Sequence, residues 1–148
     1  MFSNFSTLGN SDSGTSAPSC GNYNGADIWF ATSVGANGEL DIVTLAGSMG
    51  NAAMAVYSGS CNNLNEIACA VSDYCTGTQM PVMQLDGLSP NMPVFIRIWP
   101  ENGVGSGTFQ IRVSAGDPPG IPLPFGTTSG SASQSSGGCI QLLSLIHI

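Results

Sequence analysis

The sequence predicts an all-β fold, an antiparallel β-sandwich of jelly-roll type with about seven to nine strands, followed by a flexible tail. Three observations predict it. Short apolar runs recur along residues 1–114, the segments between them are rich in Gly, Asn, Ser and Pro, and no long window shows the 3.6-residue period of a helix.

Seven runs rich in apolar and β-branched residues are the candidate strands. They span residues 26–34, 39–46, 52–58, 66–71, 78–86, 93–99 and 107–114. Alternation in the last two runs places Val94 and Ile96 on one apolar face, and Phe109 and Ile111 on another. We expect these two runs to pair as a hairpin, with Phe95 and Arg112 in contact on its outer surface.

The charge balance excludes several classes of partner. Charged residues make up 7% of the chain, the formal net charge is −7, and Arg97 and Arg112 are its only basic residues apart from one histidine. Binding to nucleic acid or anionic lipid needs clusters of Lys and Arg, so neither is expected. No stretch approaches the roughly 18 apolar residues that span a bilayer, which argues against membrane insertion.

Five cysteines in a small polar chain indicate disulfides formed in an oxidising compartment. No Cys-x-x-Cys pair is present, so zinc and redox sites are not predicted. Cys61 and Cys69 close a short loop between neighbouring β runs, and we predict a disulfide between them. Cys20 has two candidate partners, Cys75 and a cysteine upstream of this chain, and Cys139 is expected to be unpaired.

The composition divides the chain into a β-sandwich domain at 1–114, a Gly/Pro/Ser-rich linker at 115–138 and the start of a truncated further segment at 139–148. One short apolar segment, Ile-Pro-Leu-Pro-Phe at 121–125, interrupts the linker. The last six residues, 143–148, match the translation of a transposase adapter used in sequencing libraries. We therefore expect the natural chain to continue differently there, and also to begin upstream of Met1.

Catalytic groups are scarce, and no enzyme is predicted. Histidine occurs once, at His147, and lysine is absent, so no base is available to activate a serine inside the domain. Five of the nine acidic residues are expected at strand ends or turns, exposed to solvent; they are Asp27, Asp41, Asp73, Asp86 and Glu101.

Two aromatic residues are candidates for ligand binding. Trp99 and Tyr74 lie next to predicted loops, where an exposed ring can stack on a sugar or on a partner protein. The alternative for Trp99 is that it covers the edge of the sandwich. Trp29 is expected in the core, and no metal ligands are predicted.

Three motifs in a fixed order carry a resemblance to a known family. The first joins Pro-Ser-Cys at 18–20 to Asp-Ile-Trp-Phe at 27–30, and the second joins Ala-Val-Tyr-Ser-Gly-Ser-Cys at 55–61 to Ile-Ala-Cys at 67–69. The third runs from Leu-Asp-Gly-Leu-Ser-Pro at 85–90 to Phe-Ile-Arg-Ile-Trp at 95–99. Over about residues 2–114 this order resembles the jelly-roll repeats of secreted Bacteroidota-type proteins, which are related to bacterial pre-peptidase C-terminal domains.

The resemblance implies a non-catalytic module of a larger protein that is secreted or held at the bacterial cell surface, where it binds or spaces. Its expected partners are an extracellular glycan or protein and neighbouring domains of the same chain. Two alternatives remain open: an accessory domain of a secreted peptidase or glycosidase, and a structural stalk repeat. Some relatives bind Ca²⁺ at a turn matching residues 70–75. Here that turn has only Asp73 and an added Cys75, so we predict no cofactor, with Ca²⁺ as the one candidate left open.

Overall fold

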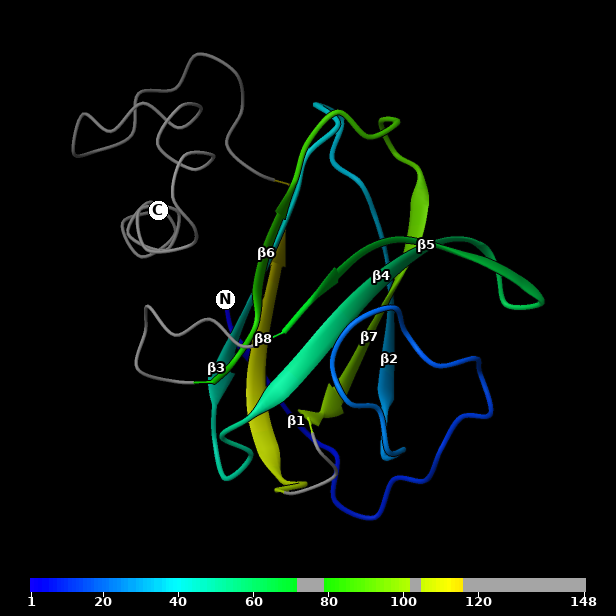
Figure 1. Ribbon diagram of the computed structural model, residues 1–148. Coiled ribbons are helices and arrows are strands. Elements are labelled where there is room, and N and C mark those ends of the chain that lie inside the picture. The colour runs from blue at the N-terminus through cyan, green and yellow to red at the C-terminus, as the bar shows by residue number, and fades with distance from the viewer. Residues whose placement is uncertain (72–78, 102–104, 116–148) are drawn as a thin grey trace.

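The computed structural model describes residues 1–71, 79–101 and 105–115, and these form an all-β sandwich. Eight strands build two antiparallel four-stranded sheets that pack face to face (Figure 1). The predicted fold class is therefore confirmed. Residues 116–138 of the linker proposed at 115–138, and the C-terminal segment at 139–148, lie outside the described residues, as do Asp73, Tyr74, Cys75 and Cys139.

Each sheet places strands that are far apart in the sequence side by side. Sheet I has the order β1 (Ser3–Ser6), β8 (Thr108–Ser114), β3 (Leu40–Ala46) and β6 (Val82–Leu85). Sheet II has the order β2 (Ile28–Ser33), β7 (Pro93–Pro100), β4 (Ala52–Ser60) and β5 (Asn63–Ala70). Among the strands of the described residues, only β4 and β5 are consecutive and also pair, and every other connection crosses between the sheets. This is the connectivity of a jelly roll.

The core lies between the two sheets and follows from the two-residue alternation of the strands. In β7, Val94, Ile96 and Ile98 point inward and are fully buried, and Phe109 and Ile111 face them from β8. Burying each such side chain contributes roughly 1.5–3 kcal/mol to folding. Methionines fill the remaining space; Met49, Met54, Met80 and Met83 are all buried.

All seven predicted runs contain a strand, but the boundaries and one strand differ. The run at 78–86 forms a strand only over Val82–Leu85, and the edge strand β1 (Ser3–Ser6) was not predicted. β1 consists of Ser, Asn and a single Phe, so it has too few apolar positions to show an alternating pattern. Its register against β8 comes from tertiary pairing, which places Phe5 opposite Phe109.

The predicted hairpin between the last two runs is wrong. β7 pairs with β2 and β4, whereas β8 pairs with β1 and β3 in the other sheet. The apolar faces of β7 and β8 do both point inward, but they meet across the core instead of lying side by side. Phe95 and Arg112 are therefore on opposite outer surfaces, and Arg112 stacks over Phe2 instead, 5.2 Å from the ring centroid.

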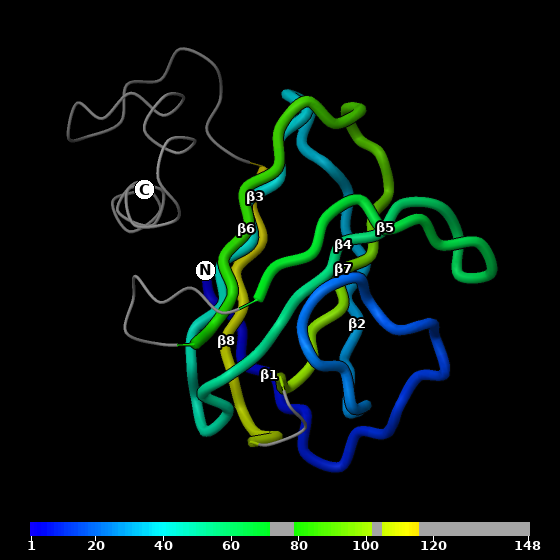
Figure 2. The backbone as a smooth tube through the Cα atoms, viewed as in Figure 1, coloured from blue at the N-terminus to red at the C-terminus, as the bar shows by residue number. Residues whose placement is uncertain are grey.

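A long loop, residues 7–27, crosses the outer face of sheet II (Figure 2). Between loop and sheet lies a second apolar cluster, built around Trp99, Tyr57, Ala53 and Ala55 and joined by Tyr23 of the loop. Small alanines on β4 lie next to large side chains on β7, because Ala53 pairs with Trp99. The outer face of this sheet is thus largely covered, unlike that of a typical solvated antiparallel sheet.

The turn between β4 and β5 requires a glycine. Gly59 has φ +97°, and a Cβ there would collide with the carbonyl oxygen of Asn63. We expect Gly59→Ala to lower the free energy of unfolding by about 2 kcal/mol or more, because the left-handed conformation alone costs about 1–2 kcal/mol. Urea unfolding followed by tryptophan fluorescence measures this change.

Gly50→Ala is the matched control for this prediction. A Cβ at Gly50 meets no atom within 4 Å, and its φ is not in the left-handed region. We expect a change within about 0.5 kcal/mol, as for ordinary surface substitutions. Equal losses for the two variants would contradict the turn geometry.

Candidate functional site

A buried ion pair joins the long loop to sheet II. The side chain of Arg97, in the middle of β7, is 0% exposed, and its Nε donates to Oδ2 of Asp27 at 2.8 Å. Its Nη1 and Nη2 donate to the carbonyl oxygens of Ser16 at 2.8 Å and Thr15 at 3.3 Å. Arg97 therefore supplies hydrogen-bond donors to a loop that lacks regular secondary structure of its own.

The carboxylate of Asp27 accepts hydrogen bonds from three side chains and one backbone amide. Ser13 donates through its amide at 3.0 Å and its hydroxyl at 2.6 Å, and Trp29 donates through Nε1 at 3.0 Å, in addition to Arg97. Burial by itself raises the pKa of Asp27, but the hydrogen bonds from Ser13 and Arg97 outweigh burial and leave it below its ordinary value. Asp27 is thus a buried, ionised group, and the prediction that it is solvated is wrong. Asp41 is also buried.

Aromatic rings enclose the Arg97 guanidinium. Its Cζ lies 4.2 Å from the ring centroid of Tyr23 and 5.1 Å from that of Trp29. Tyr23 also donates through its hydroxyl to Asp12 at 2.6 Å. Burial, with this hydrogen bond, raises the pKa of Tyr23 to about 12. The loop therefore covers the arginine with a tyrosine that stays neutral at physiological pH.

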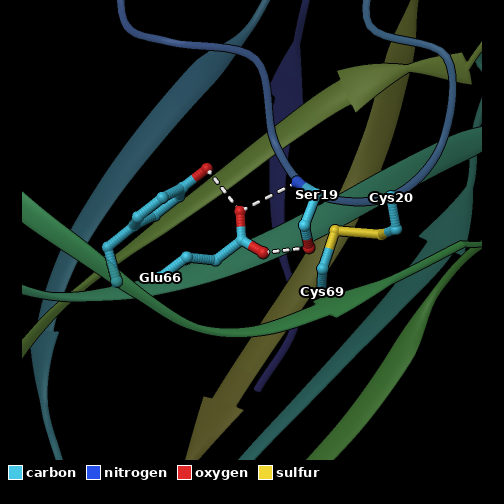
Figure 3. The surroundings of a disulfide bond; sticks show 5 residues. Ser19, Cys20, Glu66 and Cys69 are labelled. Atoms are coloured by element: carbon cyan, nitrogen blue, oxygen red, sulfur yellow. Dashed lines mark hydrogen bonds between the residues drawn. A yellow bond between two sulfur atoms is a disulfide. The ribbon is translucent and has the colours of Figure 1, made fainter.

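A disulfide fixes the same loop to β5. Cys20 is bonded to Cys69, with their Cα atoms 5.9 Å apart (Figure 3). Beside it, the amide of Ser19 donates to Glu66 at 3.1 Å, and its hydroxyl donates to the other oxygen of the same carboxylate. The hydroxyl of Tyr57 also reaches Glu66, at 3.3 Å.

This disulfide corrects both predicted pairings. Cys61–Cys69 does not form, because Cys61 lies in the exposed turn beyond β4 while Cys69 lies far along β5, opposite Ala55. Separation along an extended strand of this length is roughly 20 Å, well beyond the reach of a disulfide. Cys20 bonds to Cys69, so it does not pair with Cys75. Cys61 is a free, exposed thiol.

The burial of the two tryptophans is the reverse of what a ligand-binding Trp99 and a core Trp29 would show. Trp99 is 0% exposed, with Tyr23 packed edge-on against it at 5.9 Å between ring centroids, so it cannot stack on an external ligand. The backbone of Gly21 also passes over it, and a Cβ there would lie 3.5 Å from Cζ2 of Trp99. Trp29, expected in the core, is half-buried on the outer face of sheet II.

A groove of about 330 Å³ lies on this outer face, beside the ion pair. Its lining is mostly apolar and comes from β2, β7, β5, the β4–β5 turn and the long loop. The lining residues are Thr15, Trp29, Phe30, Ala31, Cys61, Leu64 and Phe95. Trp29, Ala31 and Phe95 share one face of the sheet because Ala31 pairs directly with Phe95. The groove therefore brings together the rings of Trp29 and Phe95, one leucine and the free thiol, whereas the ring of Phe30 packs against Phe109 in the core.

The groove and the ion pair carry little other reactive chemistry. Over residues 1–71, 79–101 and 105–115 no group of three or more His, Cys, Asp or Glu side chains could hold a metal ion. The positive charge next to the Asp27 carboxylate is the guanidinium of Arg97.

The described part of the chain contains no long apolar helix able to span a bilayer. Comparisons with protein-family models, with curated proteins and with solved structures find no match to this chain.

The lowered pKa of Asp27 predicts a pH-dependent stability. The folded chain binds this proton more weakly than the unfolded chain does. The stability contributed by the ionised carboxylate is therefore complete above its ordinary pKa, 3.8, and is lost as the pH falls through the lower folded value. We expect Asp27→Asn to lose less free energy of unfolding between about pH 7 and about pH 3 than the unaltered chain does.

Urea unfolding at a series of pH values measures this effect. The matched control is Asp86→Asn, which changes an exposed carboxyl on the same domain. We expect the control to keep the pH profile of the unaltered chain. An Asp27→Asn variant whose stability falls with acid as steeply as that of the control would contradict the interpretation.

Proposed function

We propose that this chain is a non-catalytic binding module and that the groove on sheet II binds an apolar polypeptide segment. The observation that carries the proposal is the groove itself: an open, largely apolar surface with Trp29, Phe95 and Leu64 grouped on one face. Half-buried apolar side chains that line an open groove on a small domain are typical of interaction sites.

The lining favours a peptide over a sugar. Specific sugar binding combines ring stacking with several hydrogen bonds. The polar side-chain groups lining the groove are the hydroxyl of Thr15, the thiol of Cys61 and the indole N–H of Trp29, which already donates to Asp27. The carboxylate of Asp27 is already occupied by Ser13 and Arg97. An extended apolar segment needs few polar side-chain partners and gains most from contact with the two aromatic rings.

The frame around the groove supports a binding role. Thr15 is held by Arg97, and the disulfide Cys20–Cys69 fixes the same loop to β5, the strand that carries Leu64. A groove held in this way is formed before the ligand arrives, so binding costs little ordering entropy.

The proposed setting is extracellular, in a larger secreted or cell-surface protein. A disulfide is typical of an oxidising compartment, and the charged fraction of 7% is far below the roughly 25% of an average soluble domain. The resemblance to secreted jelly-roll repeats points to the same setting. Neighbouring domains of the parent chain would then supply catalysis or attachment.

Binding of the full chain to an array of apolar and proline-containing peptides, with a glycan array in parallel, tests the proposal. We expect Leu64→Asp, which places a charge in the groove, to weaken peptide binding about tenfold or more, equivalent to about 1.4 kcal/mol. Leu45→Asp is the matched control, because Leu45 is 38% exposed on the other sheet, and its affinity should stay within about twofold.

Two results would contradict the proposal. One is the absence of any peptide ligand. The other is a peptide that binds the Leu64→Asp and Leu45→Asp variants equally well. A glycan whose binding is abolished by Leu64→Asp would replace the polypeptide with a sugar as the ligand. Thermal unfolding of both variants shows whether the fold is retained.

A further inference from the structure

We infer that residues 121–125 of this same chain, Ile-Pro-Leu-Pro-Phe, occupy the groove on sheet II. The inference rests on the proposed function, since it assumes that the groove accepts an extended apolar peptide. It goes further by naming the occupant, which makes the site self-regulated. This segment lies outside the described residues, and the inference is drawn from its sequence and from the place where the chain leaves the sandwich.

The chain leaves the domain close to the groove. Ala115, directly after β8, lies against Gly35: a Cβ at Gly35 would be 2.5 Å from that of Ala115. Gly35 follows β2, and Ala31 of the groove is four residues back along this strand, about 13 Å away. From Ala115 to Ile121 an extended chain spans about 20 Å. The tether is therefore long enough to reach the groove.

The size of the segment matches that of the groove. The lining extends from β2 across β7 and β4 to Leu64 on β5, which is three strand spacings or about 14 Å. Five residues in the polyproline conformation extend about 15 Å. Residues before proline favour extended backbone, so Ile121 and Leu123 are biased toward this conformation.

The chemistry of the two partners also agrees. Residues 121–125 are uncharged, as are the residues that line the groove, so docking buries no ionised group. Proline-rich segments bind aromatic-lined grooves because their extended form loses little entropy on binding. The rest of the tail from 116 to 138 consists mostly of Gly, Ser, Thr, Pro and Ala. The next large apolar residues of the tail begin at Ile140, 15 positions beyond Phe125, and the control variant below tests whether they compete.

Occupation in cis has a consequence for other ligands. A tethered segment acts at an effective concentration of about 1 mM, so even a Kd of about 0.5 mM keeps the groove about two-thirds filled. An external peptide would then bind with an apparent affinity about threefold weaker than its intrinsic affinity.

The thiol of Cys61 reports on the groove directly, because it lies in the lining and is exposed. The experiment measures the rate at which iodoacetamide alkylates Cys61 in the full, native chain, with peptide mass spectrometry to separate it from other cysteines. We expect Leu123→Ala/Phe125→Ala to raise this rate about threefold by emptying the groove. The matched control, Ile140→Ala/Leu142→Ala, removes apolar side chains elsewhere in the tail and should leave the rate unchanged.

Two further measurements make the result specific. Leu64→Asp should raise the alkylation rate of Cys61 even when residues 121–125 are intact. A synthetic peptide of residues 118–127 at millimolar concentration should restore the slow rate in Leu123→Ala/Phe125→Ala, and the same peptide with alanine at positions 123 and 125 should not. Leu123→Ala/Phe125→Ala changes residues outside the sandwich, so loss of folding does not imitate its effect. Leu64 is half-buried against the cluster around Trp99, so thermal unfolding of Leu64→Asp checks that this variant keeps its fold.

Equal alkylation rates in the unaltered chain, Leu123→Ala/Phe125→Ala and the control would overturn the inference. That failure is distinct from failure of the proposed function. If the rates are equal and an external peptide still binds in a Leu64-dependent way, the groove is a peptide site whose occupant comes from another molecule.

Discussion

The buried ion pair between Arg97 and Asp27 is the interaction on which the outer face of sheet II depends. Removing one partner of such a pair typically costs about 3–5 kcal/mol, because the other charge is left without compensation. Here the pair also sets the path of a long loop, since the same guanidinium binds the carbonyl oxygens of Thr15 and Ser16. The cover over Trp99 and one wall of the groove follow from it.

The disulfide adds a second, independent restraint on that loop. Cys20 and Cys69 are 49 residues apart, and closing a loop of that length removes about 4 kcal/mol of conformational freedom from the unfolded chain by the chain-entropy estimate. A bond between Cys61 and Cys69 would have closed only a short turn within one hairpin. The observed pairing instead joins the loop to an edge strand, which explains how a segment without regular secondary structure can form part of a binding surface.

Local patterns predict the strands of this protein well, and they predict its tertiary partners poorly. Alternation identifies Val94, Ile96 and Ile98 as inward-facing because it depends on adjacent residues alone. It cannot tell whether β7 and β8 pair or face each other, since both arrangements bury the same side chains. The burial of Arg97 had one signal, a lone charge between two isoleucines. Its partner Asp27 lies 70 residues away, and only the fold brings the two together.

The most direct test of this account is a double-mutant cycle on the ion pair, with Asp27→Asn, Arg97→Met and the combined variant compared by urea unfolding at neutral pH. Each single change should lower the free energy of unfolding by about 3–5 kcal/mol. The combined variant should lose clearly less than the sum, because it leaves no unpaired buried charge. Losses that add to within about 0.5 kcal/mol would show that the two side chains act independently and would contradict the account.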